Sequence, residues 1–260
     1  MDTSTILQLY DQQERQQGSH SLYRREVTPD VVRHICTLPE RLHFIIYSNL
    51  TAVSADRVIQ EQIAYFQTIG GFGLEWKVYD HDQPPDLKER LIAHGFQPGE
   101  AEGLLVLDME EAPPIYWKPV TADVRRVTTI EQARDIVAIQ EQVWDDDFGW
   151  LEAQLSEFMA EPDFWSIYLA CVDDKPVCAA WASFPPGSQF AGLWGGATLA
   201  AYRGRGMYTA LVNTRAQEAR QRGYRFLTID ATDMSRAILE KRGFRFLTST
   251  YPYTWKPSLL

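Results

Sequence analysis

One stretch, residues 195–211, constrains the fold of this 260-residue chain more than any other. It reads Gly-Gly-Ala-Thr-Leu-Ala-Ala-Tyr-Arg-Gly-Arg-Gly-Met-Tyr-Thr-Ala-Leu, which predicts a short strand, a glycine-rich turn and the start of a helix. The first N–H groups of a helix have no partner within it and lie at the positive end of its dipole. Glycines let the backbone approach an anion, and Arg203 and Arg205 add fixed charge. The stretch therefore predicts a turn that binds phosphate groups.

The spacing of this turn differs from two well-known phosphate-binding motifs. No Gly-Lys-Ser/Thr follows, as a Walker loop requires, and no third glycine completes G-x-G-x-x-G. The alternative is an ordinary strand–turn–helix connection in which glycine only allows a tight turn. That alternative does not explain why two arginines lie beside the glycines.

The turn resembles the cofactor loop of the GNAT superfamily, the acyl-CoA-dependent N-acyltransferases, whose consensus is Gln/Arg-x-x-Gly-x-Gly/Ala. Arg203 and Gly206 match this consensus, whereas Tyr208 stands where a small residue is usual. The following order also agrees, with a helix to about residue 222, a strand over 226–230 and a second helix that ends in Gly-Phe. The C-terminal part of the chain is therefore identified as a GNAT-like domain.

The resemblance implies a transferase that uses acetyl-CoA, with direct attack of a neutral amine on the thioester carbonyl and a backbone amide that stabilises the oxyanion. The central strand would part from the next one to admit the thioester. The expected acceptor is an amine of a small molecule or a peptide, and no metal site is expected. The expected cofactor-binding residues lie on the strand, on the turn and at one position where the family often has asparagine: Gly196, Ala197, Thr198, Arg203, Gly204, Arg205, Gly206, Met207, Tyr208, Thr209 and Thr232.

The catalytic residues do not follow the family's pattern. The family often has a tyrosine acid four residues before the last Gly-Phe glycine, where this chain has Leu239, and the central strand lacks a glutamate base. The candidates are Asp230, Tyr208 and Tyr251, followed by Tyr253 and Asp146. Each has a structural alternative, namely a strand-end turn, helix packing, sheet packing or surface charge. Two functions therefore stay open: a transferase, and a non-catalytic acyl-CoA-binding or sensing module.

The charge distribution favours a compact polyanion as ligand. The net charge is −10, yet residues 203–245 hold ten basic against four acidic residues, a net of +6 that leaves −16 for the rest. A basic island in an acidic protein attracts a molecule such as coenzyme A, while the net charge argues against general nucleic-acid binding. The alternative is that Arg220, Arg222 and Arg225 belong to a solvated helix face.

The N-terminal part repeats the element order of the C-terminal part. A Leu-x-x-x-Gly-Phe segment at 91–96 recurs 148 positions later at 239–244, and each follows a strand that ends in aspartate. The repeat predicts two related domains. Residues 49–54 of the first copy offer neither glycine nor arginine, so this copy is expected to lack a cofactor site. A chance match of one helix ending is the alternative.

The predicted fold class is α+β, with two GNAT-like domains in tandem, each a mixed, mostly antiparallel twisted sheet flanked by helices. We expect a degenerate N-terminal domain over 1–112, a proline-rich linker over 113–119 and the acetyltransferase domain over 120–260. The first domain would cover the active site. Residues 144–150 combine three aspartates with aromatic residues, which suits an amine, but a solvated turn that caps the next helix is equally compatible.

The remaining sequence features point to a cytoplasmic protein with reduced thiols. No apolar run is long enough to span a bilayer, and the N-terminus has no basic segment followed by an apolar one. Cys36, Cys171 and Cys178 lack metal-ligand spacing. We expect no nucleic-acid or membrane partner, and a homodimer is compatible with the sequence.

Overall fold

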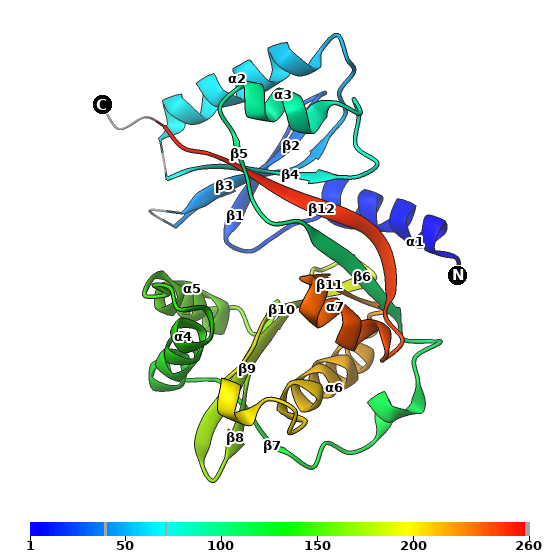
Figure 1. The fold of residues 1–260 in the computed structure, drawn as a ribbon, viewed down its shortest axis with the longest axis vertical. Helices are drawn as coiled ribbons and strands as arrows, with labels where there is room; N and C mark the ends of the chain where they lie inside the picture. Colours follow the sequence, from blue (N-terminus) through cyan, green and yellow to red (C-terminus); the bar gives the residue numbers. More distant parts are fainter. Residues whose placement is uncertain (39–40, 71, 258–260) are drawn as a thin grey trace. The chain divides into compact units, whose positions relative to one another are not determined.

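The computed structural model describes residues 1–38, 41–70 and 72–257, and its fold is drawn in Figure 1. The chain forms two compact units. Unit 1 contains Met1–Leu105 together with the described residues from Asp230 onward, and unit 2 contains Val106–Ile229.

The C-terminal strand explains why these units differ from the expected domains. Strand β12 (Arg245–Trp255) pairs antiparallel with β4 (Gly73–Tyr79) in an unbroken register of six residue pairs. Its Tyr253 and Trp255 are buried in the core of unit 1. The expected second domain, residues 120–260, therefore gives its last strand to unit 1, because the apolar face of β12 completes that core.

Unit 1 is a mixed sheet flanked by helices. Its strands follow the order β1-β2-β3-β4-β12, in which β3 and β4 are parallel and the other pairs are antiparallel. Figure 1 shows α2 and α3 together over one face of this sheet. In chain order its elements are α1 (Thr3–Tyr10), a π-helical turn (Asp11–Gln16), β1 (Tyr23–Val27), β2 (Val31–Cys36), β3 (Leu42–Ser48), α2 (Ala55–Ile69), β4, α3 (Leu87–Ala93), β5 (Gln97–Pro98), β6 (Glu102–Asp108), which continues into unit 2, then α7 (Asp233–Glu240) and β12.

The core of unit 1 follows from simple periodicities. In β4 the alternation buries Leu74 and Trp76 and turns Glu75 and Lys77 to the other face. The helices contribute residues at helical spacing, such as Val58, Ile59 and Phe66 of α2.

Unit 2 is also a mixed sheet with helices on both faces. Its strands follow the order β11-β10-β9-β8-β7, and β10 and β11 are parallel whereas the other pairs are antiparallel. In chain order its elements are a 3-10 turn (Pro114–Trp117), β7 (Asp123–Arg126), α4 (Ile130–Trp144), α5 (Trp150–Ala160), β8 (Trp165–Val172), β9 (Lys175–Ser183), β10 (Phe190–Thr198), a 3-10 turn (Ala200–Tyr202), α6 (Met207–Gln221) and β11 (Phe226–Ala231), whose last residues belong to unit 1.

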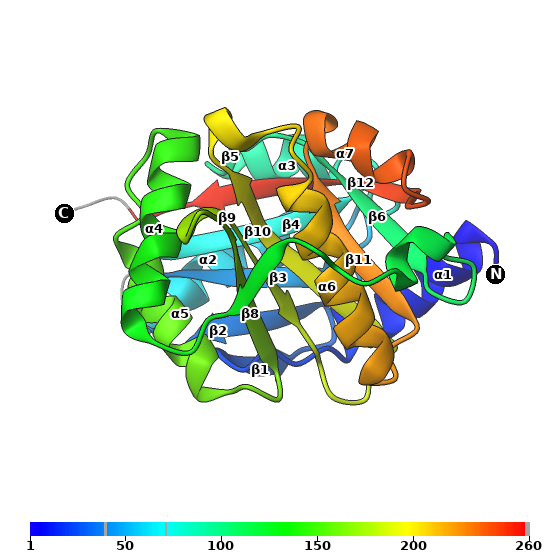
Figure 2. The same cartoon turned by 90° about the horizontal axis from the view of Figure 1, so that it is seen from below.

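Alternation along β8 assigns the two faces of this sheet. Trp165 stacks on Phe158 of α5, with ring centroids 3.7 Å apart, while the Tyr168 hydroxyl donates to Glu218 of α6 at 2.6 Å. Residues an odd number apart on a strand point to opposite faces. The views in Figure 1 and Figure 2 agree that α4 and α5 lie together on one face and α6 on the other.

The proline-rich segment is packed against α6 and is not an extended linker. Tyr116 is fully buried, and the Gln217 side-chain amide donates to the carbonyls of Tyr116 and Lys118 at 2.7 and 2.9 Å. The Asn213 amide donates to the Ile115 carbonyl at 3.3 Å. Residues 113–119 are therefore part of unit 2, because α6 satisfies their backbone carbonyls.

The predicted repeat is present in the structure, down to its hydrogen bonds. In unit 1 the Phe96 N–H donates to the Leu91 carbonyl at 3.0 Å, and Gly95 has φ +90°. At the equivalent positions the Phe244 N–H donates to the Leu239 carbonyl at 3.1 Å, and Gly243 has φ +96°. Both helices thus end in the same glycine cap with the same buried phenylalanine.

Candidate functional site

The predicted phosphate-binding turn is a loop at the N-terminus of α6 that glycine shapes. Gly204 has φ +72°, and Gly206, the residue that caps α6, has φ +85°. A Cβ built on either glycine would meet no heavy atom within 4 Å. Glycine is therefore needed at both positions for the backbone conformation and not for space.

Arg203, Arg205 and Lys175 bring positive charge to this loop. The Arg203 Nε donates to the Thr198 carbonyl at 3.2 Å, and the Arg205 guanidinium carbon lies 5.2 Å from the Tyr202 ring centroid. Lys175 lies 5.9 Å from the same centroid. Neither arginine forms a salt bridge with a described residue, and both are exposed. Their charge is thus available to a ligand.

The backbone of α6 adds donors to this charge. The Ala210 N–H makes the first intrahelical bond, to the Gly206 carbonyl at 2.9 Å. The N–H groups that precede it in the first turn have no partner inside the helix, and that turn contains no acidic residue. The loop from Arg203 to Thr209, called the cradle below, therefore combines positive charge with the backbone donors of a helix N-terminus, the features that suit an anion.

Next to the cradle, β10 parts from β11. The parallel register joins Phe190 with Phe226 and ends at Gly192 with Thr228. Beyond this point β10 continues in register with β9, where Thr198 pairs with Cys178. The parting expected from the sequence is thus present, and it leaves one edge of β10 without a described strand beside it.

A bulge interrupts β10 between Trp194 and Ala197. Gly195 has φ +62°, and a Cβ there would lie 2.0 Å from the Trp181 ring. A Cβ on Gly196 would lie 2.7 Å from the Tyr208 ring. Both glycines are therefore required because aromatic rings pack directly on the bulged backbone.

Two buried polar side chains that the sequence analysis did not name contact this bulge. Gln140 of α4 donates to the Gly195 carbonyl at 2.7 Å, and Arg215 of α6 donates to the Trp181 and Trp194 carbonyls at 3.0 and 3.3 Å. A sequence signal existed, since each is a polar residue on an otherwise apolar helix face: Gln140 follows Ala133 and Ile136, and Arg215 follows Leu211 and Val212.

The candidate Asp230 lies in unit 1, in an ion pair. Its Oδ2 is 2.6 Å from the Lys77 Nζ, and its Oδ1 accepts from the Thr250 hydroxyl at 3.2 Å. Burial lowers the pKa of Lys77, but the Asp230 carboxylate outweighs this effect and the net pKa is raised. These contacts give Asp230 a structural role in joining β4, β11 and β12.

The other candidates divide between the two units. Tyr208 is half-buried in unit 2, at the start of α6, and packs on the cluster that contains Tyr168 and Cys178. Tyr251 belongs to unit 1, where its ring centroid lies 3.3 Å from the Lys88 Nζ. Burial raises the pKa of Tyr253, which lies in the core of unit 1. Thr232 caps α7 in unit 1 and contacts the Ser235 hydroxyl at 3.3 Å.

The acidic segment after α4 is an exposed turn. The Asp146 carboxylate accepts from the Asp147 N–H at 2.8 Å, and the Asp147 carboxylate accepts from the Gly149 N–H at 2.8 Å. Trp144 and Trp150 on either side are 54% and 44% exposed. Local hydrogen bonds thus account for two of the three aspartates, as a turn requires. The expected capping of the next helix is wrong, because α5 begins after Gly149 and no described side chain caps its first N–H groups.

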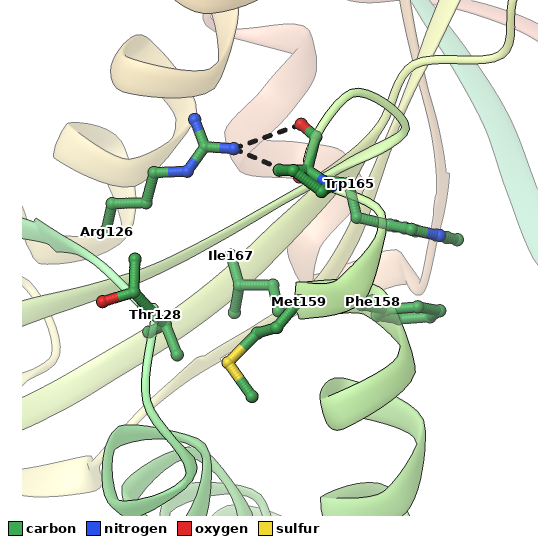
Figure 3. Close-up of a pocket in the computed structure, with 8 residues that line it drawn as sticks. Arg126, Thr128, Phe158, Met159, Trp165 and Ile167 are labelled. Atoms are coloured by element: carbon green, nitrogen blue, oxygen red, sulfur yellow. Dashed lines mark hydrogen bonds between the residues drawn. The ribbon is translucent and has the colours of Figure 1, made fainter.

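Unit 2 also contains a small cavity away from the cradle, shown in Figure 3. Its volume is about 90 Å³, and its lining includes Arg126, Met159 and Ile167 but none of the predicted site residues. Arg126 donates across it to the carbonyls of Pro162 and Trp165 at 3.3 and 3.2 Å. Ligand sites usually exceed about 300 Å³, so this cavity is a packing gap between α5 and the sheet.

The described residues contain no group of three or more His, Cys, Asp or Glu side chains that could hold a metal ion. Within the same part of the chain, no helix combines the length and apolar composition that a membrane crossing would need.

Comparison with known proteins identifies the family of part of the chain and the fold of the whole. Residues 130–244 match the model of the Acetyltransferase (GNAT) family. The sequence matches no curated protein. Among solved structures, a GCN5-related N-acetyltransferase from Kribbella flavida is similar over 99% of this chain and 95% of its own, with a TM-score of 0.67 and 16% identity.

Two other solved structures are also similar to this chain. A tandem GNAT protein from the clavulanic acid biosynthesis pathway is similar over 88% of this chain and 79% of its own, with a TM-score of 0.58 and 14% identity. A putative GNAT-family acetyltransferase from Novosphingobium aromaticivorans is similar over 90% and 92%, with a TM-score of 0.56 and 14% identity. The expected fold class, α+β with two GNAT-like domains in tandem, is confirmed, and residues 130–244 are a domain of the GNAT acetyltransferase family.

Proposed function

We propose that this protein transfers an acetyl group from acetyl-CoA to an amine of a small molecule or a peptide. The cradle from Arg203 to Thr209 would hold the pyrophosphate. The free edge of β10 at Gly196–Thr198 would pair with the pantetheine arm as an added strand does. The thioester would then lie in the gap where β10 parts from β11.

One observation carries this proposal. The N-terminus of α6 combines two glycines with positive φ, two exposed arginines without a salt bridge to described residues and no acid in its first turn. This combination costs stability in the absence of an anion, because like charges repel and glycine loses more backbone freedom than other residues on folding. A bound pyrophosphate would offset both costs.

The proposed reaction balances without a further reactant. The amine nitrogen forms a bond to the acyl carbon, the C–S bond breaks, and CoA leaves as a thiolate that takes up a proton. We assign the proton donor to Tyr208, because of the three leading candidates it alone lies in the same unit as the cradle. Water would remove the amine proton, since Asp230 is paired with Lys77.

The N-terminal copy and the cellular compartment are the two remaining parts of the proposed function. Residues 1–112 would be a GNAT-like copy without a cofactor site. The reaction would take place in the cytoplasm, where Cys36, Cys171 and Cys178, all buried free thiols, would stay reduced.

Calorimetric titration with acetyl-CoA tests the cradle. We expect micromolar binding by the wild type, with a loss of at least about 100-fold in the double variant Arg203→Ala/Gly206→Glu. The matched control is Arg134→Ala, which removes an exposed arginine of unit 2 whose partner is Glu152. A folded wild type that binds no acetyl-CoA would refute the proposal.

A second candidate function is a non-catalytic acyl-CoA-binding module. It is favoured because Asp230 is paired and Leu239, at the family's frequent acid position, is fully buried. Release of free thiol from acetyl-CoA in the presence of a panel of amines separates the two functions. Amine-dependent release supports the transferase, while tight binding without release across the panel supports the module.

A further inference from the structure

The bulge of β10 is held from both faces of the sheet of unit 2. Gln140 contacts it from α4 on one face, and Arg215 contacts it from α6 on the other (Figure 1). The two side chains bind successive carbonyls, those of Gly195 and Trp194. Both are nearly inaccessible to solvent, with 3% and 1% of their surface exposed.

The orientation of the Gln140 amide is fixed by Trp144. The indole Nε1 of Trp144 can only donate, and it lies 2.9 Å from the Gln140 Oε1. The Nε2 of Gln140 must therefore face the Gly195 carbonyl, 2.7 Å away, as a donor. This short bond ties the carbonyl to α4.

Arg215 is a buried cation whose described partners are carbonyls. Besides Trp181 and Trp194, it donates from Nε to the Leu211 carbonyl at 3.0 Å. No described carboxylate forms a salt bridge with it, and its Nη2 has no hydrogen-bond partner among the described atoms. Burial lowers the pKa of Arg215. An uncompensated buried charge is costly to stability.

The two contacts change what the free edge of β10 presents. In a regular strand, carbonyls point along the sheet toward the neighbouring strands. At this bulge two successive carbonyls are instead committed to side chains on opposite faces. Successive carbonyls of a strand face opposite neighbours, so one of these two would otherwise have faced the edge that β11 leaves after Gly192. That edge therefore lacks one acceptor that would repel a negatively charged oxygen.

We propose that Gln140 and Arg215 are positioning residues, which keep the free edge of β10 as a set of donors for the acyl carbonyl of an acyl-CoA. The inference rests on the proposed function and deepens it. Backbone N–H groups stabilise an oxyanion only where no carbonyl competes for the same place. The buried charge of Arg215 acts in the same direction, since it favours negative charge near the bulge.

The test compares two glutamines that each donate to backbone carbonyls. Gln140→Ala removes the contact with the bulge, and the matched control Gln217→Ala removes the contacts with Tyr116 and Lys118. Calorimetry gives the affinity of each protein for CoA and for acetyl-CoA. We expect Gln140→Ala to keep the wild-type affinity for CoA within about threefold and to lose about tenfold for acetyl-CoA.

Two variants of Arg215 and a hydrogen-exchange measurement distinguish a loss of positioning from a general loss of folding. Arg215→Lys keeps the charge and a donor and should retain most of the preference for acetyl-CoA, whereas Arg215→Met should lose it. Hydrogen exchange of the peptide over 193–199 should accelerate about tenfold in Gln140→Ala and stay unchanged in Gln217→Ala.

The outcomes separate this inference from the proposed function. A wild type that binds no CoA refutes the proposed function, and the positioning role fails with it. A wild type that prefers acetyl-CoA, with an equal preference in Gln140→Ala and unchanged exchange over 193–199, overturns the positioning role alone. A wild type that binds CoA and acetyl-CoA equally also overturns it.

Discussion

The two sequence repeats share an order of elements but differ where their first helix begins. β10-α6-β11-α7 and β3-α2-β4-α3 are equivalent, with a parallel strand pair on either side of the first helix. Helix α6 begins at Gly206 in the left-handed conformation, whereas α2 begins at Ser54, whose φ is −89°. The same topology thus presents two different helix N-termini.

The two helices differ in whether their first turn contains a carboxylate that can interact with the unpaired backbone N–H groups. The first turn of α2 carries its own carboxylate, Asp56, which pairs with Arg90 and accepts from the His94 Nε2 at 3.0 Å. The first turn of α6 has no acid, and its arginines form no salt bridge with described residues. The proposed anion binding therefore depends on the loop sequence, since the shared fold fits a helix with its acid built in equally well.

The largest effect is expected from making α6 resemble α2. Tyr208→Asp places a carboxylate at the position in the first turn that Asp56 has in α2. We expect acetyl-CoA affinity to fall at least about 100-fold, because this charge competes with the pyrophosphate for the same N–H groups. Calorimetry measures the loss, and Tyr208→Phe should bind as the wild type does. Undiminished binding by a folded Tyr208→Asp variant would contradict the assignment of the cradle.

A second comparison concerns Asp230, a candidate for catalysis that the structure pairs with Lys77. Asp230→Asn leaves the lysine buried without its partner, so the free energy of unfolding should fall by about 2–4 kcal/mol. Denaturant unfolding measures it, and Lys77→Met/Asp230→Asn should recover most of the loss. If Asp230→Asn keeps full stability but loses all turnover, Asp230 acts in catalysis instead.

As the pH falls, unit 1 should lose stability at a higher pH than unit 2. All five histidines of the chain precede residue 95 and so lie in unit 1. Burial, and then repulsion by Arg25, lower the pKa of His34 to about 4 from an ordinary 6.5. The unfolded chain therefore binds a proton that the folded chain does not. The stabilisation by neutral His34 is complete above pH 6.5 and falls by about 1.4 kcal/mol per pH unit down to about pH 4.

Hydrogen exchange at several pH values checks this prediction, and His34→Gln should remove the part of the slope that His34 contributes. Burial also lowers the pKa of His20, to about 3, so the variant should keep a slope of the same sign. Glu75 has the opposite effect on how the free energy of unfolding changes with pH. Burial raises its pKa to about 6, against the effect of Lys77, so protonation between pH 6 and its ordinary value of 4.5 favours the folded state. Glu75→Gln should therefore make unit 1 more acid-sensitive in that window. If the two units lose stability equally as the pH falls, the attribution of acid sensitivity to the buried groups of unit 1 is refuted.

The smallest effect is expected from the converse change in α2. Asp56→Asn should not create a second acetyl-CoA site, because residues 49–54 contain neither the glycines nor the arginines of the cradle. The calorimetric stoichiometry should stay at one acetyl-CoA per chain. A second binding event would mean that the acid alone blocks the N-terminal copy.

Local features could be predicted from the sequence because local residues determine them. The turn at Gly204 and Gly206 and the two Gly-Phe helix ends depend on a few adjacent residues, and the structure contains all of them. The strands β1 and β2 were not predicted, because charged residues such as Arg24 and Arg33 interrupt their apolar alternation.

Long-range pairings could not be predicted from this one sequence. Lys77 and Asp230 are 153 positions apart, and Gln140 and Gly195 are 55 apart. Neither pair leaves a periodic signal, because an ion pair or a single hydrogen bond needs only one residue from each side. The transfer of β12 to unit 1 is of the same kind, since its alternation fits either sheet.

The pairing of β12 with β4 sets the order in which the protein can mature during synthesis. The ribosome completes residues 1–105 long before β12, so β4 waits with one edge unpaired. Unit 2 is continuous in sequence and can close its core first. Residues 1–105 are therefore translated before unit 2 but complete their sheet after it, and until then the open edge of β4 can pair with other chains.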